Sequence, residues 1–110
     1  MKLSEIVEKL SLNPVQPEYV DKEITTAYTG DLLSDVMGNA DDECILVTIQ
    51  AHKNTIAVAT LKESPAIILC NDRPIPDDMI ETAKDEKIAL FSTSLNQYQV
   101  SGKLFSLLGK

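Results

Sequence analysis

The sequence predicts an α/β fold: a single three-layer domain, residues 1–110, in which helices flank a mostly parallel four-stranded sheet. Three observations support this prediction. Short apolar runs alternate with amphipathic segments along the chain. Two of these runs, residues 44–49 and 66–70, are almost continuously apolar, which is typical of strands buried on both faces of a parallel sheet. The length of 110 residues suits one domain, and an apolar fraction of 44% excludes intrinsic disorder.

The first half of the chain reads as two helices and two strands. Apolar residues recur with helical spacing from Leu3 to Leu10, and the prolines that follow predict a loop. The segment KEITTAY alternates and is rich in β-branched residues, as strands are. The glycine and asparagine at positions 38 and 39 suit the left-handed end of a short helix. We therefore expect, in order, a helix over 3–10, a strand over 22–28, a helix over 31–37 and a strand over 44–49.

Residues 55–62 are ambiguous. Their Val, Ile and Thr content favours a strand, which would make Lys53 and Asn54 the turn of a hairpin. Their alanines, together with Asn54 as a helix cap, favour a helix that packs on the sheet. The helix is the interpretation that we favour.

The second half continues the alternation with a strand over 66–70 and a proline-stiffened loop over 71–76. Asp78 and Glu81 have the spacing of a capping box and predict a helix to about residue 86. A strand follows at 88–91, and Ser94 with Gln97 repeats the capping pattern before a closing helix. One face of this last helix is expected to contain Leu95, Tyr98, Gly102, Phe105 and Leu108.

Charge and cysteine content exclude several functions. A net charge of −7, with Arg73 the single arginine, argues against a nucleic-acid partner. The N-terminus lacks the apolar core of a secretory signal, and no segment has the roughly 18 consecutive apolar residues of a membrane helix. We therefore expect no membrane partner and a cytoplasmic location. Cys44 and Cys70 have no metal-ligand spacing and are expected as buried reduced thiols, so neither a metal nor another cofactor is expected.

A ligand site is expected where the parallel strands end. In parallel sheets, ligands bind beyond the carboxyl ends of the strands, which here are residues 28–31, 50–54, 71–76 and 92–94. The polar side chains of these loops suit a small anionic metabolite or nucleotide. The candidate ligand-binding residues are His52, Lys53, Asn54, Asn71, Arg73, Thr93 and Ser94.

Each candidate also has a simpler interpretation. His52 could act as a base or anion ligand, or be a solvated loop residue, and no acidic partner for it is identifiable. Arg73 could bind a phosphate or carboxylate, or pair with the aspartates of its own loop. Thr93 and Ser94 could present free N–H groups at a helix start, as any capped helix does. No nucleophile motif and no phosphate-binding G-x-x-x-x-G-K-[ST] loop is present, so we expect no enzyme.

Four segments together resemble the stand-alone DRTGG-domain proteins. They are YTGDLLSDVM (28–37), ILVTIQAHKN (45–54), AIILCNDRPIP (66–76) and FSTS (91–94), and the resemblance covers essentially the whole chain. Related domains form the N-terminal part of HPr kinase/phosphorylase. The resemblance implies a fold like that N-terminal domain, and it marks Tyr28, Gly30, Asp31, Ser34 and Asp35 as interface or family-motif residues.

The resemblance further implies a non-catalytic regulatory module that forms a homodimer, with the chemistry done elsewhere. A small metabolite or nucleotide bound at the carboxyl edge of the sheet would be the regulatory signal. The alternative is an accessory subunit that binds a protein partner of a redox or phosphotransfer system and takes no small ligand.

Overall fold

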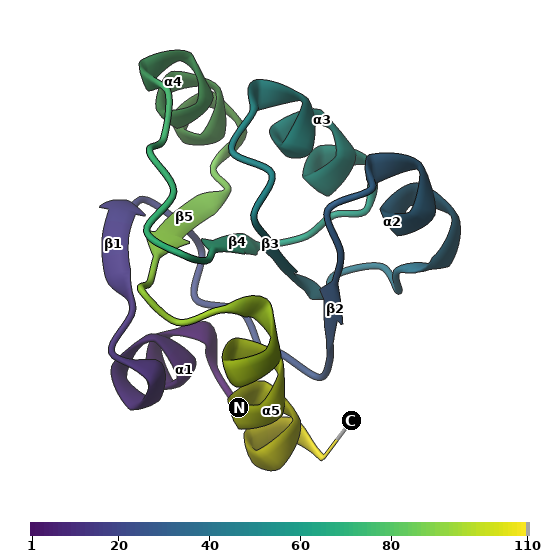
Figure 1. Cartoon of the computed structure of the whole chain (residues 1–110), viewed down its shortest axis with the longest axis vertical. Helices are drawn as coiled ribbons and strands as arrows, with labels where there is room; N and C mark the ends of the chain where they lie inside the picture. The colour runs from purple at the N-terminus through teal and green to yellow at the C-terminus, as the bar shows by residue number, and fades with distance from the viewer. Residues whose placement is uncertain (110) are drawn as a thin grey trace.

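Five strands form one sheet in the computed structural model, which describes residues 1–109 (Figure 1). Their order across the sheet is β1-β5-β4-β3-β2. Strands β2 to β5 run parallel, and β1 is antiparallel to β5. The predicted mostly parallel sheet is therefore confirmed, with five strands instead of four. Their bounds are β1 (Asn13–Gln16), β2 (Ala27–Thr29), β3 (Ile45–Thr48), β4 (Ala66–Leu69) and β5 (Ala89–Ser92).

Helices cover both faces of this sheet, as predicted. Helices α2, α3 and α4 lie on one face, and α1 and α5 lie on the other (Figure 1). The three on one face each join neighbouring parallel strands, and successive crossovers of one hand that step in one direction place their helices on the same side. The helix bounds are α1 (Leu3–Leu10), α2 (Leu33–Asn39), α3 (Lys53–Leu61), α4 (Asp77–Glu86) and α5 (Gln97–Leu108).

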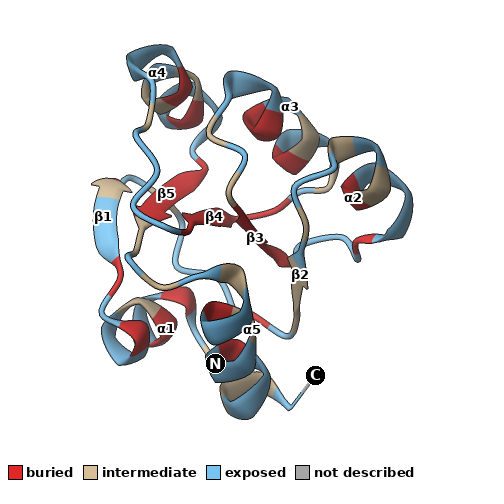
Figure 2. Cartoon of the chain, in the orientation of Figure 1, coloured by how far each residue is buried: buried red, intermediate tan, exposed pale blue. Residues whose placement is uncertain are grey.

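The central strands supply two cores. Successive side chains alternate between the faces of a sheet, so Val47 and Ile68 pack toward α1 and α5 while Leu46 and Ile67 pack toward α2 to α4. All residues of β3 and β4 are buried (Figure 2). This burial on both faces is the physical reason for the continuous apolar runs in the sequence.

Strand β1 is the element that the sequence did not predict. Its segment NPVQ was expected to be a loop because proline donates no hydrogen bond to a sheet. Proline is tolerated here because β1 is an edge strand that pairs only with β5. The buried Gln16 side chain strengthens this edge, since its Nε2 donates to the carbonyl oxygen of Ile88 at 3.0 Å.

Two further boundaries in the first half differ from the prediction. The expected strand over 22–28 is regular only in β2, because Ile24 is held against the N-terminus by a hydrogen bond from its N–H to the Met1 carbonyl. Helix α2 starts two residues later than expected and includes Gly38 and Asn39, and Asn39 is its last residue. The C-cap residue, Ala40, is extended, so the predicted left-handed end is wrong.

The ambiguous segment after β3 is a helix, as favoured. Thr55, Ile56 and Ala59 are the residues that α3 buries against the sheet. The cap of α3 is His52 instead of Asn54. The capping boxes expected for the last two helices are also displaced: α4 begins after Pro76 without a side-chain cap, and the box of α5 is formed by Asn96 and Gln99.

Candidate functional site

The carboxyl edge of the sheet gathers the predicted ligand-binding residues. Because β3, β4 and β5 are parallel neighbours, the loops that follow them leave the sheet at the same edge. The loops after β4 and β5 are joined by two backbone hydrogen bonds. The N–H of Asn71 donates to the Leu95 carbonyl at 3.0 Å, and that of Asp72 donates to the Thr93 carbonyl at 2.9 Å. Asn71, Arg73, Thr93 and Ser94 thus belong to one connected loop pair.

Arg73 is exposed and makes no ion pair among the described residues, where the three ion pairs involve other groups. The interpretation that it pairs with aspartates of its own loop is therefore wrong. The loop is shaped instead by its backbone, since Asn71 and Asp72 both adopt left-handed conformations with φ of 63° and 48°. Such conformations suit Asn and Asp better than most other residues.

His52, Lys53 and Asn54 form the start of α3. The Nδ1 atom of His52 accepts a hydrogen bond from the Asn54 N–H at 3.0 Å, which is the geometry of a helix cap. The hydrogen bonds and ion pairs within residues 1–109 give this imidazole no carboxylate partner, so a base oriented by an acid is not assembled. Lys53 is exposed at the first position of the helix.

Thr93 and Ser94 precede α5 and do not cap it. The Thr93 hydroxyl oxygen accepts from the Leu95 N–H at 3.2 Å. The N–H of Gln99 is satisfied by the Asn96 side chain at 2.9 Å, and the Gln99 side chain accepts from the Asn96 N–H at 3.0 Å. The capping box formed by Asn96 and Gln99 therefore satisfies N–H groups at the helix start that the sequence suggested as an anion site.

Three of the five family-motif residues converge. The Tyr28 hydroxyl donates to Oδ2 of Asp35 at 2.6 Å, and this hydrogen bond, more than burial, raises the pKa of Tyr28. A Cβ atom on Gly30 would make ordinary contacts, 3.7 Å from the Tyr28 ring and 3.8 Å from Asp35, so Gly30 lies directly beside this pair. Asp31 and Ser34 stay exposed beside this cluster.

The outer face of α5 was not predicted as a surface. The sequence placed Leu95 and Leu108 on the same face as Tyr98 and Phe105, and this is wrong, because Leu95 and Leu108 pack against the core. Tyr98 and Phe105 are exposed, with 87% and 64% of their surface accessible. The residues that α5 buries are Val100 and Leu104. We call Tyr98, Gly102 and Phe105, with the adjoining Lys103, the outer α5 face.

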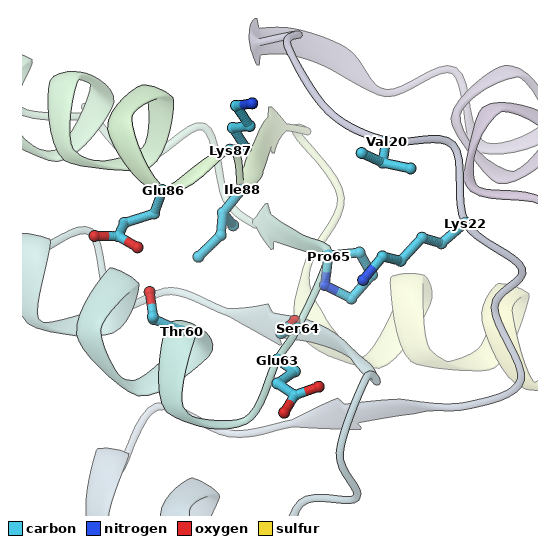
Figure 3. A pocket seen from close by; sticks show the side chains of 9 residues that line it. All are labelled: Val20, Lys22, Thr60, Glu63, Ser64, Pro65, Glu86, Lys87 and Ile88. Carbon is cyan, nitrogen blue, oxygen red and sulfur yellow. The ribbon is translucent and has the colours of Figure 1, made fainter.

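A hollow of about 250 Å³ at the amino edge of the sheet was also missed (Figure 3). It lies where α3 and α4 end and where β4 and β5 begin. Charged residues of both signs, Lys22, Glu63, Glu86 and Lys87, line it together with apolar residues that include Pro65 and Ile88. No motif could have indicated it, because its residues come from three segments that are distant in the sequence.

Three further features of residues 1–109 concern metal binding, membrane spanning and the cysteines. No cluster of three or more His, Cys, Asp or Glu side chains there could hold a metal ion. No helix in the described part of the chain has the length and apolar character needed to cross a membrane. Both cysteines are free and buried, as predicted, and burial raises the pKa of Cys70 to about 11.

Comparison with known proteins gives the family. The model of the family described as HPr Serine kinase N terminus matches residues 46–108, more than half of the chain. The chain belongs to the HPr serine kinase N-terminus family. The matched region of this family member includes the loops after β3, β4 and β5 and the whole of α5.

The similar proteins are longer than this family member. It is 26% identical over 123 aligned positions to the HPr kinase/phosphorylase of Streptococcus pneumoniae (strain ATCC 700669 / Spain 23F-1), a match that covers 96% of the chain and 40% of the kinase. A second match, to the HPr kinase/phosphorylase of Streptococcus uberis (strain ATCC BAA-854 / 0140J), is 37% identical over 43 residues, 39% of the chain and 14% of that kinase. The chain therefore spans about 40% of the length of the Streptococcus pneumoniae relative.

The fold is similar to a DRTGG-containing structure. A crystal structure of the CBS and DRTGG domains of the regulatory region of Clostridium perfringens pyrophosphatase, complexed with its activator diadenosine tetraphosphate, matches with a TM-score of 0.68. The match covers 93% of this chain and 44% of the other at 15% identity. With the family match, it confirms the resemblance to DRTGG domains.

Proposed function

We propose that this family member is a non-catalytic regulatory module that pairs with a second copy of itself. The observation that carries the proposal is the outer α5 face, where two large aromatic side chains are exposed on a helix with little charge. Large exposed aromatics without a local packing role are typical of protein interaction sites. The family match to the N-terminal part of a kinase and the fold match to a regulatory region support the regulatory role.

The shape of this face suits a second copy. Tyr98 and Phe105 lie one turn to either side of Gly102, and a Cβ atom on Gly102 would meet nothing within 4 Å. Aromatic projections thus flank an open depression, and a surface with both features can be complementary to itself, as a twofold interface requires. Lys103 is the single charged residue of α5, so two chains of net charge −7 repel each other little along this face.

The regulatory signal in this proposal is a small anionic metabolite or nucleotide at the carboxyl edge. Arg73 and Lys53 follow the neighbouring strands β4 and β3, and neither is neutralised by an ion pair within the described residues. Arginine binds phosphate and carboxylate groups through its planar fork. Diadenosine tetraphosphate, the activator in the Clostridium perfringens structure, is the first probe that we would test.

Self-association is tested by light scattering coupled to size-exclusion chromatography. We expect the wild type to be a dimer and the double variant Tyr98→Ser/Phe105→Ser to be a monomer with an unchanged circular dichroism spectrum. The matched control is Leu61→Ser, which removes another exposed apolar side chain, 67% accessible, from α3. A monomeric wild type, or a double variant that remains dimeric, would reject pairing through α5.

Ligand binding is tested by thermal denaturation with diadenosine tetraphosphate, other nucleotides and phosphate. A ligand at 100 times its Kd stabilises a protein by about 2.7 kcal/mol, which for a domain of this size raises the Tm by roughly ten degrees or more. Arg73→Ala and Lys53→Ala should remove this rise, and Lys103→Ala on α5 should keep it. A wild type whose Tm does not respond to any probe would reject the ligand part of the proposal.

The accessory-subunit alternative makes opposite predictions. It expects a monomer in isolation, no Tm response to the ligand panel, and a protein partner whose capture depends on Tyr98 and Phe105. The same two experiments, followed by capture of partners with the wild type and the double variant, therefore separate the two functions.

A further inference from the structure

The hollow at the amino edge of the sheet is built by elements that surround it on several sides. Thr60 and Glu63 come from the end of α3 and the turn after it, and Glu86 comes from the last turn of α4. Val20 and Lys22 come from the irregular segment before β2. In Figure 3 the two acidic residues lie on the side of the helices, Lys22 and Val20 lie on the opposite side, and Ile88 lies between them.

The charges around this hollow are not paired with one another. The three ion pairs among the described residues involve Met1 with Glu23, Lys62 with Asp42 and Lys84 with Glu18. Two glutamates and two lysines therefore line one hollow of about 250 Å³ without forming a direct ion pair with one another. Helices α3 and α4 both end here, and the partial negative charge of their C-termini adds to the two carboxylates on that side.

Backbone conformation singles out two of these charged residues. Glu63 and Lys87 follow the ends of α3 and α4 with φ of 54° and 55°, the left-handed region in which glycine is favoured. The sequence has a charged side chain at both positions instead. Ser11 and Glu43 adopt the same conformation outside the hollow, so this conformation makes Glu63 and Lys87 suitable positions for glycine variants and does not by itself mark a ligand site.

The remaining lining is small: Val20, Pro65 and Ile88 are apolar, and Thr60 and Ser64 carry hydroxyl groups. Pro65 and Ile88 are buried, and Val20 is 63% exposed at the rim. Sites for drug-sized ligands occupy about 300–1,000 Å³, so this hollow suits a smaller molecule than a nucleotide. A phosphate group alone could bind the lysines but would leave the two carboxylates without a cationic partner. A ligand that matches the whole lining needs an ammonium group, an anionic group and a short apolar portion.

We propose that this hollow binds a small aliphatic α-amino acid such as leucine. The ammonium group lies toward Glu63 and Glu86 at the two helix ends. The carboxylate lies toward Lys22, because the Lys87 side chain points away from the other lining residues in Figure 3. The aliphatic side chain packs against Pro65, Ile88 and Val20. The site is independent of the proposed function, because it shares no residue with the outer α5 face or with Arg73 and its loop.

The test is a titration of ¹⁵N-labelled protein followed by NMR. About 10 mM leucine fills a site of millimolar Kd, and it should shift the amide signals of Ser64, Ala66 and Ile88. The same concentration of isoamylamine, which lacks the carboxylate, or of 4-methylpentanoate, which lacks the ammonium group, should give shifts at least fivefold smaller.

Two matched glycine variants separate binding from folding. Glu63→Gly removes a carboxylate and relieves the left-handed backbone, so it should keep or raise the Tm of the free protein and weaken leucine binding at least tenfold. Glu43→Gly relieves a similar conformation, φ 64°, outside the hollow and should leave leucine binding unchanged. Lys22→Ala should also weaken binding of leucine.

The proposal is overturned if leucine shifts no signal near Ser64 and Ile88, if the two analogues bind as well as leucine, or if Glu63→Gly binds leucine as the wild type does. None of these outcomes depends on Tyr98, Phe105 or Arg73. Failure of the amino-acid site and failure of the proposed regulatory function are therefore distinguishable.

Discussion

Helices α4 and α5 are anchored alike but have opposite outer surfaces. Each buries two residues spaced four apart: Met79 and Ala83 in α4, Val100 and Leu104 in α5. The rest of α4 is dominated by charge, with Asp77, Asp78, Glu81, Lys84, Asp85 and Glu86. In α5 the single charged residue is Lys103, and the exposed residues include Tyr98 and Phe105. The contrast teaches that anchoring a helix to this sheet does not dictate its outer face, so the apolar surface of α5 calls for another explanation.

The largest expected effect tests whether the two helices are anchored equally. Met79→Ala and Leu104→Ala each remove a large side chain that is at most 1% exposed. Each should lower the free energy of unfolding by about 2–5 kcal/mol, from lost burial and the cavity left behind. Urea denaturation measures both. A loss below about 1 kcal/mol for either variant would show that its helix is held mainly by other contacts.

The two cysteines extend the comparison to the two cores, since Cys44 packs on the α4 side of the sheet and Cys70 on the α5 side. Burial raises the pKa of Cys70 from 9.0 to about 11. Between pH 9 and about 11, the Cys70 thiol therefore keeps its proton in the folded state, whereas in the unfolded chain it has lost the proton. Stability from this group is therefore complete below about pH 9 and is lost as the pH rises to about 11.

The measurement for Cys70 is urea denaturation of wild type and Cys70→Ala across this alkaline range. The free energy of unfolding of the wild type should fall relative to that of the variant between pH 9 and about 11. A constant difference would contradict a buried thiol. At neutral pH, both cysteines should react slowly with a thiol reagent because both are buried.

A smaller effect tests how the two helices begin. Asn96→Ala removes the side chain that caps α5 and should lower the free energy of unfolding by about 1 kcal/mol. Ser94→Ala is the matched control, since the sequence suggested Ser94 as the cap but the structure gives that role to Asn96. Its effect should stay within about 0.5 kcal/mol. A loss for Ser94→Ala that equals or exceeds the loss for Asn96→Ala would contradict Asn96 as the cap.

The smallest effect on folding is expected at the outer surfaces themselves. Tyr98→Ser on α5 and Glu81→Ser on α4 should each change the free energy of unfolding of the monomer by no more than about 0.5 kcal/mol, because both side chains are exposed. Denaturation is measured at protein concentrations where any dimer has dissociated. A loss well above this value for Tyr98→Ser would show that the ring stabilises its own chain, and the contrast between the helices would weaken.

The sequence alone determined the α/β alternation, the buried central strands and the family. Strands β3 and β4 were predictable because burial on both faces requires continuous apolar runs, and this pattern is local. The carboxyl edge could be located as well, because parallel strands place their following loops together. The convergence of Tyr28 and Asp35 was only suggested, through the family resemblance, and the hydrogen bond between them became visible in the structure.

The tertiary structure decided what depends on distant partners. Strand β1 exists because NPVQ pairs with β5, in which Asn13 lies opposite Ser92, and a local pattern containing proline gives no sign of that pairing. Helix α5 has two apolar stripes of helical spacing, and only packing on the sheet determined that Val100 and Leu104 face inward while Tyr98 and Phe105 face solvent. The amino-edge hollow joins three distant segments. Local periodicity determines which elements form, whereas long-range packing determines which surfaces remain free to bind.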